Sequence, residues 1–411
     1  MTGFAHKTVP PPAARADSAA AAGDAILHTP NPGRQATTWS GPGADPAAAR
    51  LRARLRRDPD YAPTPLIDRP AEARALGLGA LHLKAENTRL AEAGLGSFKA
   101  LGVMGALGAL APRPSRIVCA SDGNFGRAVA WGAARLGIPA TIYLPAAVSH
   151  ARVDAIASFG AGTCRVAGGY DAAMEAAADA ACAAGVVEFT DTGHDSVTEI
   201  PAAIQTSYGV IVDEVLEALG PAPPPTHVLV PTGVGGLTAG VIAAFDAALG
   251  PRAPDVIAVQ PRATASLAAS FAAGCLTGVP EQTGSPDAPP TLMVGLACET
   301  PSSTAWPILS ARLAHALAVP DAVAVDGLRA LAQGTDGPVI AGESGAAAHG
   351  ALLAAASDRR LRAALGLSGS SRVLVLVTET ATDPEIHARL IAAAPFPAKP
   401  DPFRRSDPDD P

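Results

Sequence analysis

The sequence predicts an α/β fold with mostly parallel sheets. Short apolar segments alternate along the chain with alanine-rich segments of helical length, and glycine-rich turns join one to the next. This alternation is typical of strand–helix units whose strands run parallel. The run Arg372–Val377 is almost continuously apolar, as expected of a strand that is covered on both faces. In such a fold the ligand is expected outside the carboxyl ends of the strands.

The expected elements follow one another between residues 81 and 377. A short apolar strand at 81–83 comes first and carries Lys84 at its end. A strand at 117–120 then leads through the turn 121–126 into a helix that ends near residue 136. The remaining expected elements are strands at 140–144, 163–166, 227–230, 256–259 and 372–377, and helices that run through 158, over 170–184 and over 237–249.

The two ends of the chain are expected to lie outside this pattern. Residues 1–45 predict a flexible leader, because they show little periodicity and the prolines at 10–12 have no amide donor for a helix. One helix is predicted over 46–57. Residues 398–411 combine prolines with mixed charge and predict a loose tail.

Composition excludes several classes of function. The 411 residues carry a net charge of -7, whereas a nucleic-acid-binding protein would need a basic face. No apolar run reaches the ~18 residues that a membrane span needs, and no apolar segment follows Lys7 as in a signal peptide. Five cysteines without CxxC spacing favour reduced thiols in the cytoplasm over a disulfide framework or a metal site.

Three glycine-rich turns stand at expected strand ends. The turn 121–126 (Ser-Asp-Gly-Asn-Phe-Gly) opens a helix, so it is either an anion cradle made of backbone N–H groups or an ordinary turn. The turn 233–236 (Gly-Val-Gly-Gly) lets backbone donors approach a phosphate, yet it matches neither the Walker motif nor GxGxxG. The turn 342–345 (Gly-Glu-Ser-Gly) alone indicates only a turn.

Lys99 has two possible interpretations. It lies between Phe98 and Leu101, ahead of a helix of small residues. It could be a surface lysine whose stem covers apolar neighbours. It could instead be a desolvated amine with a lowered pKa, suited to Schiff-base chemistry. Local sequence leaves both open.

Several ordered motifs resemble the fold type II pyridoxal-phosphate enzymes, which include serine/threonine dehydratases, threonine synthase and cysteine synthase. Lys84-Ala-Glu followed by 95–99 (Leu-Gly-Ser-Phe-Lys) is similar to their lysine motif, and the turns 121–126 and 233–236 are similar to their asparagine and phosphate loops. Within the group, the resemblance is to the diaminopropionate ammonia-lyase family. Its pointers include Asp122, Asp191-Thr192, Tyr208, Asp213-Glu214, the segment 295–298 (Gly-Leu-Ala-Cys), Trp306, the turn 342–345 and the residues from Thr378-Glu379 to Pro384.

The resemblance implies two three-layer α/β domains. The large, cofactor-binding one would combine residues 46–105 with 215–397, and the small one would span 106–214. It implies that pyridoxal 5'-phosphate forms a Schiff base with Lys99. The other implied cofactor contacts are Asn124 to the 3-hydroxyl, Gly233, Val234, Gly235 and Gly236 to the phosphate, and Thr378 to the ring nitrogen.

The resemblance also implies a reaction. Lys99, Asp122 and Asp191 would be catalytic, and Ser121, Asp122, Gly123 and Asp191 would contact a small amino-acid substrate. The reaction would eliminate ammonia from 2,3-diaminopropionate in a protein that is typically a homodimer. Two alternatives stay open: a dehydratase or β-replacement synthase of the same fold, and a non-catalytic cofactor-binding protein. Two features depart from the family pattern, namely Phe125, where a histidine is usual, and the segment 193–197.

Overall fold

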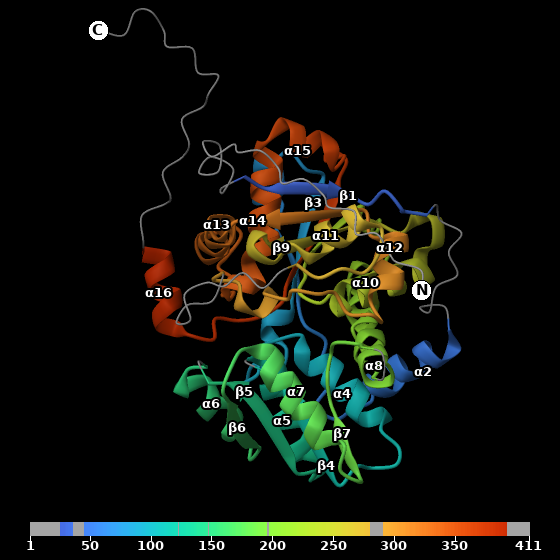
Figure 1. Cartoon of the computed structure of the whole chain (residues 1–411). Helices are drawn as coiled ribbons and strands as arrows, with labels where there is room; N and C mark the ends of the chain where they lie inside the picture. Colours follow the sequence, from blue (N-terminus) through green and yellow to red (C-terminus); the bar gives the residue numbers. More distant parts are fainter. Residues whose placement is uncertain are drawn as a thin grey trace, which may run out of the picture.

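The chain folds around two separate β-sheets in a computed structural model (Figure 1). The structure describes residues 25–35, 45–121, 123–146, 148–194, 197–279 and 291–392. Figure 1 shows the smaller sheet at the bottom, in green, and the larger sheet at the top, built from segments coloured at both ends of the scale. The chain therefore leaves the larger sheet, builds the smaller one and returns.

The larger sheet has seven strands in the order β1-β10-β9-β8-β11-β3-β2. Its five inner strands are mutually parallel, and the edge strands β1 and β2 run antiparallel to their neighbours. Parallel pairing brings the carboxyl ends of the inner strands to one edge of the sheet. The strands are β1 (Leu27–Pro30), β2 (Leu66–Asp68), β3 (Ala80–Ala85), β8 (His227–Pro231), β9 (Asp255–Pro261), β10 (His315–Val319) and β11 (Arg372–Val377).

The smaller sheet has four parallel strands in the order β6-β5-β4-β7. Its strands are β4 (Arg116–Ala120), β5 (Ala140–Pro145), β6 (Gly162–Val166) and β7 (Val186–Glu188). The α/β class with mostly parallel sheets is thus confirmed, and the strands expected at 117–120, 140–144 and 163–166 agree with β4, β5 and β6 to within one residue at each end.

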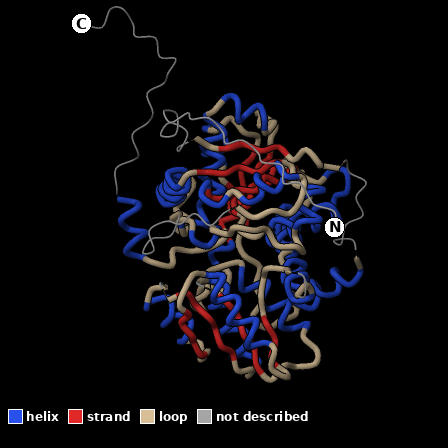
Figure 2. The backbone as a smooth tube through the Cα atoms, viewed as in Figure 1, coloured by secondary structure: helices blue, strands red, loops and turns tan. Residues whose placement is uncertain are grey.

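Helices cover both sheets, and Figure 2 shows them surrounding the strands. The first group runs from the N-terminal part into the smaller sheet: α2 (Pro46–Leu55), α3 (Pro70–Ala75), α4 (Lys99–Ala109), α5 (Asn124–Leu136), α6 (His150–Ala157) and α7 (Tyr170–Ala181). The second group belongs to the rest of the chain: α8 (Glu199–Ser207), α9 (Gly209–Leu219), α10 (Gly236–Leu249), α11 (Ser266–Ala273), α12 (Trp306–Arg312), α13 (Asp321–Gln333), α14 (Glu343–Ser357), α15 (Arg359–Ala364) and α16 (Pro384–Ala392). Single-turn 3₁₀ segments lie at Glu86–Thr88, Gly250–Arg252, Arg262–Thr264 and Val294–Leu296.

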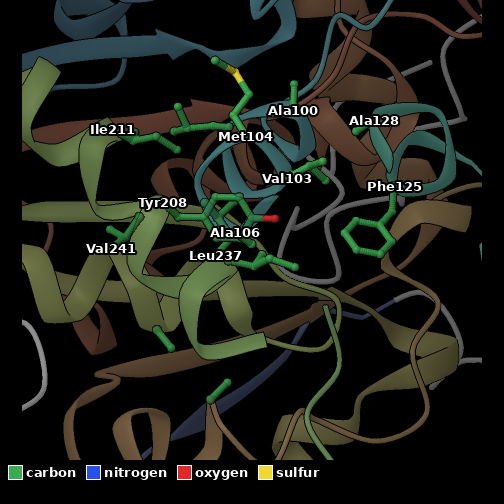
Figure 3. Close-up of a cluster of buried hydrophobic side chains, with 14 of the residues drawn as sticks. Ala100, Val103, Met104, Ala106, Phe125, Ala128, Tyr208, Ile211, Leu237 and Val241 are labelled. Carbon is green, nitrogen blue, oxygen red and sulfur yellow. The ribbon is translucent and has the colours of Figure 1, made fainter. Parts of the chain in front are cut away.

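Two hydrophobic clusters lie on opposite faces of the larger sheet. Alternate residues of β11 divide between them: Leu374 and Leu376 join the cluster with α8, α9 and α10, whereas Val373 and Val375 join the cluster with α13 and α14. Successive side chains of a strand point to opposite faces of the sheet, so a strand buried on both faces divides its residues between two clusters in this way. Figure 3 shows part of the first cluster, where α4, α5, α9 and α10 supply side chains. This layer extends to the smaller sheet, so one continuous core supports the region between the sheets.

The structure differs from the sequence prediction near the N-terminus. Leu27–Pro30, within the leader predicted for residues 1–45, form β1 and pair in register with β10. The polar, four-residue segment shows no strand pattern, since its order comes from pairing with a distant strand. The predicted helix over 46–57 ends earlier, at Leu55. Within the described ranges, no helix is both long enough and apolar enough to cross a bilayer.

Candidate active site

Lys99 is the first residue of α4 and is held beside the end of β11. The Phe98 amide donates to the Thr378 carbonyl at 3.1 Å, and the Thr380 amide donates to the Gly96 carbonyl at 2.9 Å. Gly96 has φ +56°, and a Cβ there would lie 2.5 Å from Thr380 Cγ2. A glycine is therefore required for this close pairing, which joins two predicted site segments that lie about 280 residues apart.

The Lys99 amine forms an ion pair with Asp191 and is enclosed by aromatic rings. Its Nζ hydrogen-bonds Asp191 Oδ2 and lies 5.1 Å from the centroid of Phe98 and 5.5 Å from that of Phe125. The side chain is only 20% exposed, which excludes the surface interpretation. Phe125, the departure from the usual histidine, thus forms part of the wall around the amine.

The pKa of Lys99 differs from the expectation of a lowered value. Burial does lower the pKa of the amine, but the carboxylate of Asp191 outweighs burial and holds the pKa above its ordinary value. The expected lowering was wrong for this arrangement, because local sequence gave no sign of a carboxylate 92 residues away. Lys99 carries a proton here and must pass it on before it can act as a nucleophile.

The other described lysine, Lys84, has a different environment. Its Nζ pairs with Glu214, donates to the Thr64 carbonyl at 2.6 Å and is fully buried. Arg89 also contacts Glu214, at 2.9 Å. This buried network joins β3 to α9, so Lys84 has a structural role.

The glycine turn 233–236 is fixed through its carbonyl groups. The carbonyls of Gly233, Val234 and Gly235 accept bonds from Gln260, Ser302 and Ala239. Gly235 is the N-cap and Gly236 the first residue of α10, where a helix leaves its N–H groups unused, and Gly233 and Val234 directly precede them. These N–H groups remain as donors at the positive end of the helix dipole, a suitable arrangement for a dianion.

Close packing keeps side chains out of this turn. Gly235 has φ +97°, and a Cβ there would lie 2.5 Å from Leu309 Cδ1. A Cβ on Gly233 would lie 3.0 Å from Cys298 Sγ, and one on Gly236 would lie 3.9 Å from the Asp191 carbonyl oxygen. The turn therefore adjoins both the segment 295–298 and the carboxylate residue that pairs with Lys99.

The turn at the end of β4 contributes Asn124, the first residue of α5. The Ser121 hydroxyl accepts from the amides of Gly123 at 3.3 Å and Gly126 at 2.8 Å, so it shapes the turn. A Cβ on Gly123 would meet nothing within 4 Å. Asp122 lies outside the described residues.

Two residues to which the sequence assigned no role also belong to this region. Glu379 follows Thr378 and accepts a hydrogen bond from Asn124 Nδ2 at 2.5 Å. Tyr208 packs its ring on Phe98 at 5.0 Å between centroids, and its buried hydroxyl has no hydrogen-bond partner among the described residues. Figure 3 shows this hydroxyl pointing to the side on which Phe125 lies. Both residues were among those that carry the family resemblance, but their position in the site follows only from tertiary contacts.

The arrangement fits the cofactor that the resemblance implies. A buried amine supplies the attachment point, and unused N–H groups at a helix start supply donors for a phosphate. Thr378 lies at the end of the buried strand β11, and its carbonyl accepts the Phe98 amide next to Lys99. Asn124 bonds Glu379, the residue that follows Thr378. In the described part of the chain, no cluster of three or more His, Cys, Asp or Glu side chains could hold a metal ion.

Comparison with known proteins agrees with this geometry. Residues 58–379 match the family described as "Pyridoxal-phosphate dependent enzyme". The diaminopropionate ammonia-lyase of Salmonella typhimurium is 31% identical over 81% of this chain and 89% of its own length. A crystal structure of the Escherichia coli diaminopropionate ammonia lyase, in complex with an aminoacrylate-PLP azomethine reaction intermediate, superposes with a TM-score of 0.80 at 29% identity, covering 90% of this chain and 97% of that one. A serine dehydratase-like protein of Rattus norvegicus is 33% identical over 56% of this chain and 65% of its own length.

Proposed function

Because the chain belongs to the pyridoxal-phosphate-dependent enzyme family, as a fold type II lyase, we propose that it eliminates ammonia from 2,3-diaminopropionate. The α-proton and the β-amino group leave, and hydrolysis of the three-carbon product gives pyruvate and a second ammonia. One water is consumed for each pyruvate and two ammonia formed. Diaminopropionate ammonia-lyases match about 80% of this chain at 31% identity, whereas the serine dehydratase-like relatives match 56–67% of it, which supports the proposal.

The cofactor is pyridoxal 5'-phosphate. When bound, it supplies an electron sink for the charge that develops at the substrate Cα. Lys99 would hold its aldehyde carbon, the N–H groups of 233–236 its phosphate, and Asn124 its 3-hydroxyl. Thr378 would face the ring nitrogen, where a neutral hydroxyl is a sufficient partner.

The Lys99–Asp191 pair supplies the proton chemistry in this proposal. Asp191 keeps the Lys99 amine charged in the resting protein, and it can accept the proton when the amine becomes a nucleophile. With substrate bound, the Lys99 amine would be free to move a proton at the substrate Cα. The carboxylate of Asp191 would bind the β-amino group as an ammonium ion and keep its nitrogen protonated, so that it can leave as neutral ammonia.

Asp122 is proposed as a second base on the face of the Cα opposite Lys99. A carboxylate there would repel the substrate carboxylate unless it had another task, such as removing the α-proton of the D isomer. Ser121 and Gly123 would line the substrate position next to it. Replacing Asp122 by Asn should then reduce turnover of the D isomer more than that of the L isomer.

The ion pair of Lys99 with Asp191 is the observation that carries the proposal. A dehydratase acting on serine or threonine removes a neutral hydroxyl and has no second ammonium to bind, so a carboxylate beside the reactive amine favours the diamine. The serine dehydratase-like relative makes a dehydratase the alternative, although it matches only about half of this chain. A cofactor-binding protein without turnover is the third possibility.

The test is 2-oxo acid formation by the full-length protein loaded with pyridoxal phosphate, measured as pyruvate from diaminopropionate or serine and as 2-oxobutyrate from threonine. We expect pyruvate and ammonia in a ratio of one to two from D- or L-2,3-diaminopropionate, with at least tenfold lower kcat/KM for serine and threonine. Higher kcat/KM for serine or threonine would establish the dehydratase alternative. Absence of turnover with all four amino acids would favour the non-catalytic alternative.

We also propose the larger organisation that goes with this activity. Residues 46–105 and 215–397 would form the large cofactor-binding domain and 106–214 the small one, supported by the division of the chain between two sheets. A cytoplasmic location is supported by the five cysteines, all in described parts of the chain and none in a disulfide. A homodimer is proposed from the family resemblance and is testable by light scattering.

A further inference from the structure

Glu379 is held at the meeting point of three site segments. It follows Thr378 at the end of β11, pairs as an isolated bridge with Ser97, and accepts the Gly342 amide at 3.0 Å through its carbonyl. Its side chain occupies space that glycines leave open. A Cβ on Gly342 would lie 3.0 Å from Glu379 Oε1, and one on Gly345 would lie 3.2 Å from its Cγ. The nearest atoms are backbone oxygens, that of Thr380 at 2.7 Å from a Cβ on Gly342 and that of Glu379 at 2.6 Å from one on Gly345, so the turn 342–345 makes room for the backbone of these two residues as well as for the Glu379 side chain.

The Glu379 carboxyl group determines how the Asn124 side chain is oriented. Oε2 accepts from Asn124 Nδ2 at 2.5 Å, while Arg127 Nη1 donates to Asn124 Oδ1 at 3.4 Å. An acceptor on the nitrogen side and a donor on the oxygen side both favour the same orientation of the amide. The nitrogen carries two hydrogens, and Glu379 uses one of them, so one N–H remains to donate elsewhere.

We infer that Glu379 is a positioning residue, which fixes the Asn124 amide so that its second N–H can donate to the 3-hydroxyl oxygen of pyridoxal phosphate. This inference rests on the cofactor assignment in the proposed function but not on the substrate. Glu379 itself acts through Asn124, and its contribution should vanish when the Asn124 side chain is removed.

The charges around Glu379 make this interaction sensitive to pH. Burial and, second, the charge of Glu343 at the start of α14 raise the pKa of Glu379, whereas bonds from Ser344 and the charge of Arg152 on α6 lower it, and the net pKa is about 7. Arg127 on α5 also interacts with this carboxyl group. Ionised Glu379 accepts from Asn124 with both oxygens available, whereas protonated Glu379 has lost its charge and half of its accepting capacity.

The first test is a double-mutant cycle on cofactor binding at pH 8.5, where Glu379 is ionised. The full-length protein is stripped of cofactor and titrated with pyridoxal phosphate, and the dissociation constant is read from absorbance. Glu379→Gln should raise this constant about tenfold, as expected for losing a charged acceptor. In an Asn124→Ala background, Glu379→Gln should change it less than twofold. Any larger change in that background, or no change in the native one, overturns the inference.

Glu343→Gln is the matched control, because Glu343 is a neighbouring carboxyl group that acts on Glu379 by charge and makes no recorded contact with Asn124. At pH 8.5 it should leave the cofactor dissociation constant within twofold of the native value. A larger effect would show that negative charge in this region, and not the hold on Asn124, governs cofactor binding.

A second measurement needs no change at Glu379 and covers the case in which that variant does not fold. The absorbance of bound cofactor in the native protein should titrate with a midpoint near pH 7. Glu343→Gln should move the midpoint to lower pH, and Asn124→Ala should abolish it. A midpoint that persists in Asn124→Ala contradicts the inference. Since no substrate is involved, failure of the diaminopropionate assay would leave both results intact.

Discussion

At the scale of single residues, the Lys99–Asp191 pair combines two requirements that oppose each other. The amine must be buried to react selectively, yet burial alone would lower its pKa, and Asp191 keeps it charged. A proton acceptor is therefore present at the position from which the proton must leave. In the proposed mechanism the carboxylate and the lysine would therefore act together, although they come from different segments.

Asp191→Asn tests this unit through pH. Without the carboxylate only burial remains, so the pKa of Lys99 falls and more of the amine is neutral at a given pH. The rate of pyridoxal phosphate capture by the stripped protein should then reach its plateau at lower pH than in the native protein. Turnover should nevertheless fall by about 100- to 10,000-fold, the usual contribution of a general acid–base group. Faster turnover, or an unchanged pH profile of capture, would contradict the assigned pairing.

Tyr208→Phe and Tyr61→Phe are matched variants, because each removes one tyrosine hydroxyl. The Tyr208 hydroxyl is buried and no described residue is its partner, so Tyr208→Phe should leave the free energy of unfolding of the cofactor-free protein unchanged or raise it by about 1 kcal/mol. The Tyr61 hydroxyl donates to Glu214 at 2.8 Å, so Tyr61→Phe should lower that free energy by about 1.5–3 kcal/mol. Urea unfolding measures both. A loss above about 1 kcal/mol in Tyr208→Phe would show that its hydroxyl is satisfied in the fold.

At the scale of elements, α10 has a glycine with positive φ at each end, but only Gly235 lies in the turn 233–236. Gly235 precedes the helix with φ +97° and Gly250 follows it with φ +54°. A Cβ on Gly235 would lie 2.5 Å from the buried Leu309, whereas a Cβ on Gly250 would meet nothing within 4 Å. The two glycines therefore allow the effect of backbone strain to be measured separately from the effect of crowding in the turn 233–236.

Alanine at each position tests that separation. Both Gly235→Ala and Gly250→Ala should lower the free energy of unfolding by about 1–3 kcal/mol because alanine is strained at positive φ, with an added loss for Gly235→Ala from crowding. Only Gly235→Ala should weaken pyridoxal phosphate binding, by at least tenfold in a titration. Equal binding by the two variants would mean that the turn 233–236 does not hold the phosphate.

At the scale of the whole molecule, the sequence predicted those parts of the fold that local patterns determine. The inner strands were found because burial on both faces makes runs such as Arg372–Val377 almost wholly apolar. β1 was missed because pairing with β10, far along the chain, gives order to a short polar segment.

The same difference between local sequence patterns and long-range contacts applies to the site. Glycine turns and Lys99 leave local signals, since a turn needs particular residues in sequence. The bond from Asn124 to Glu379 and the ion pair to Asp191 leave none, because they join segments 255 and 92 residues apart. The raised pKa of Lys99 could not be foreseen for the same reason.

The attachment point of the cofactor tests the central claim most directly. The lysines of the chain are Lys7, Lys84, Lys99 and Lys399, so borohydride reduction of the loaded protein and peptide mass mapping can identify the modified residue without ambiguity. We predict that the pyridoxyl group is found on the peptide with Lys99, and that this label is lost in Lys99→Ala. Labelling of Lys84, which the structure buries in a separate ion-pair network, or no labelling at any lysine, would contradict the account.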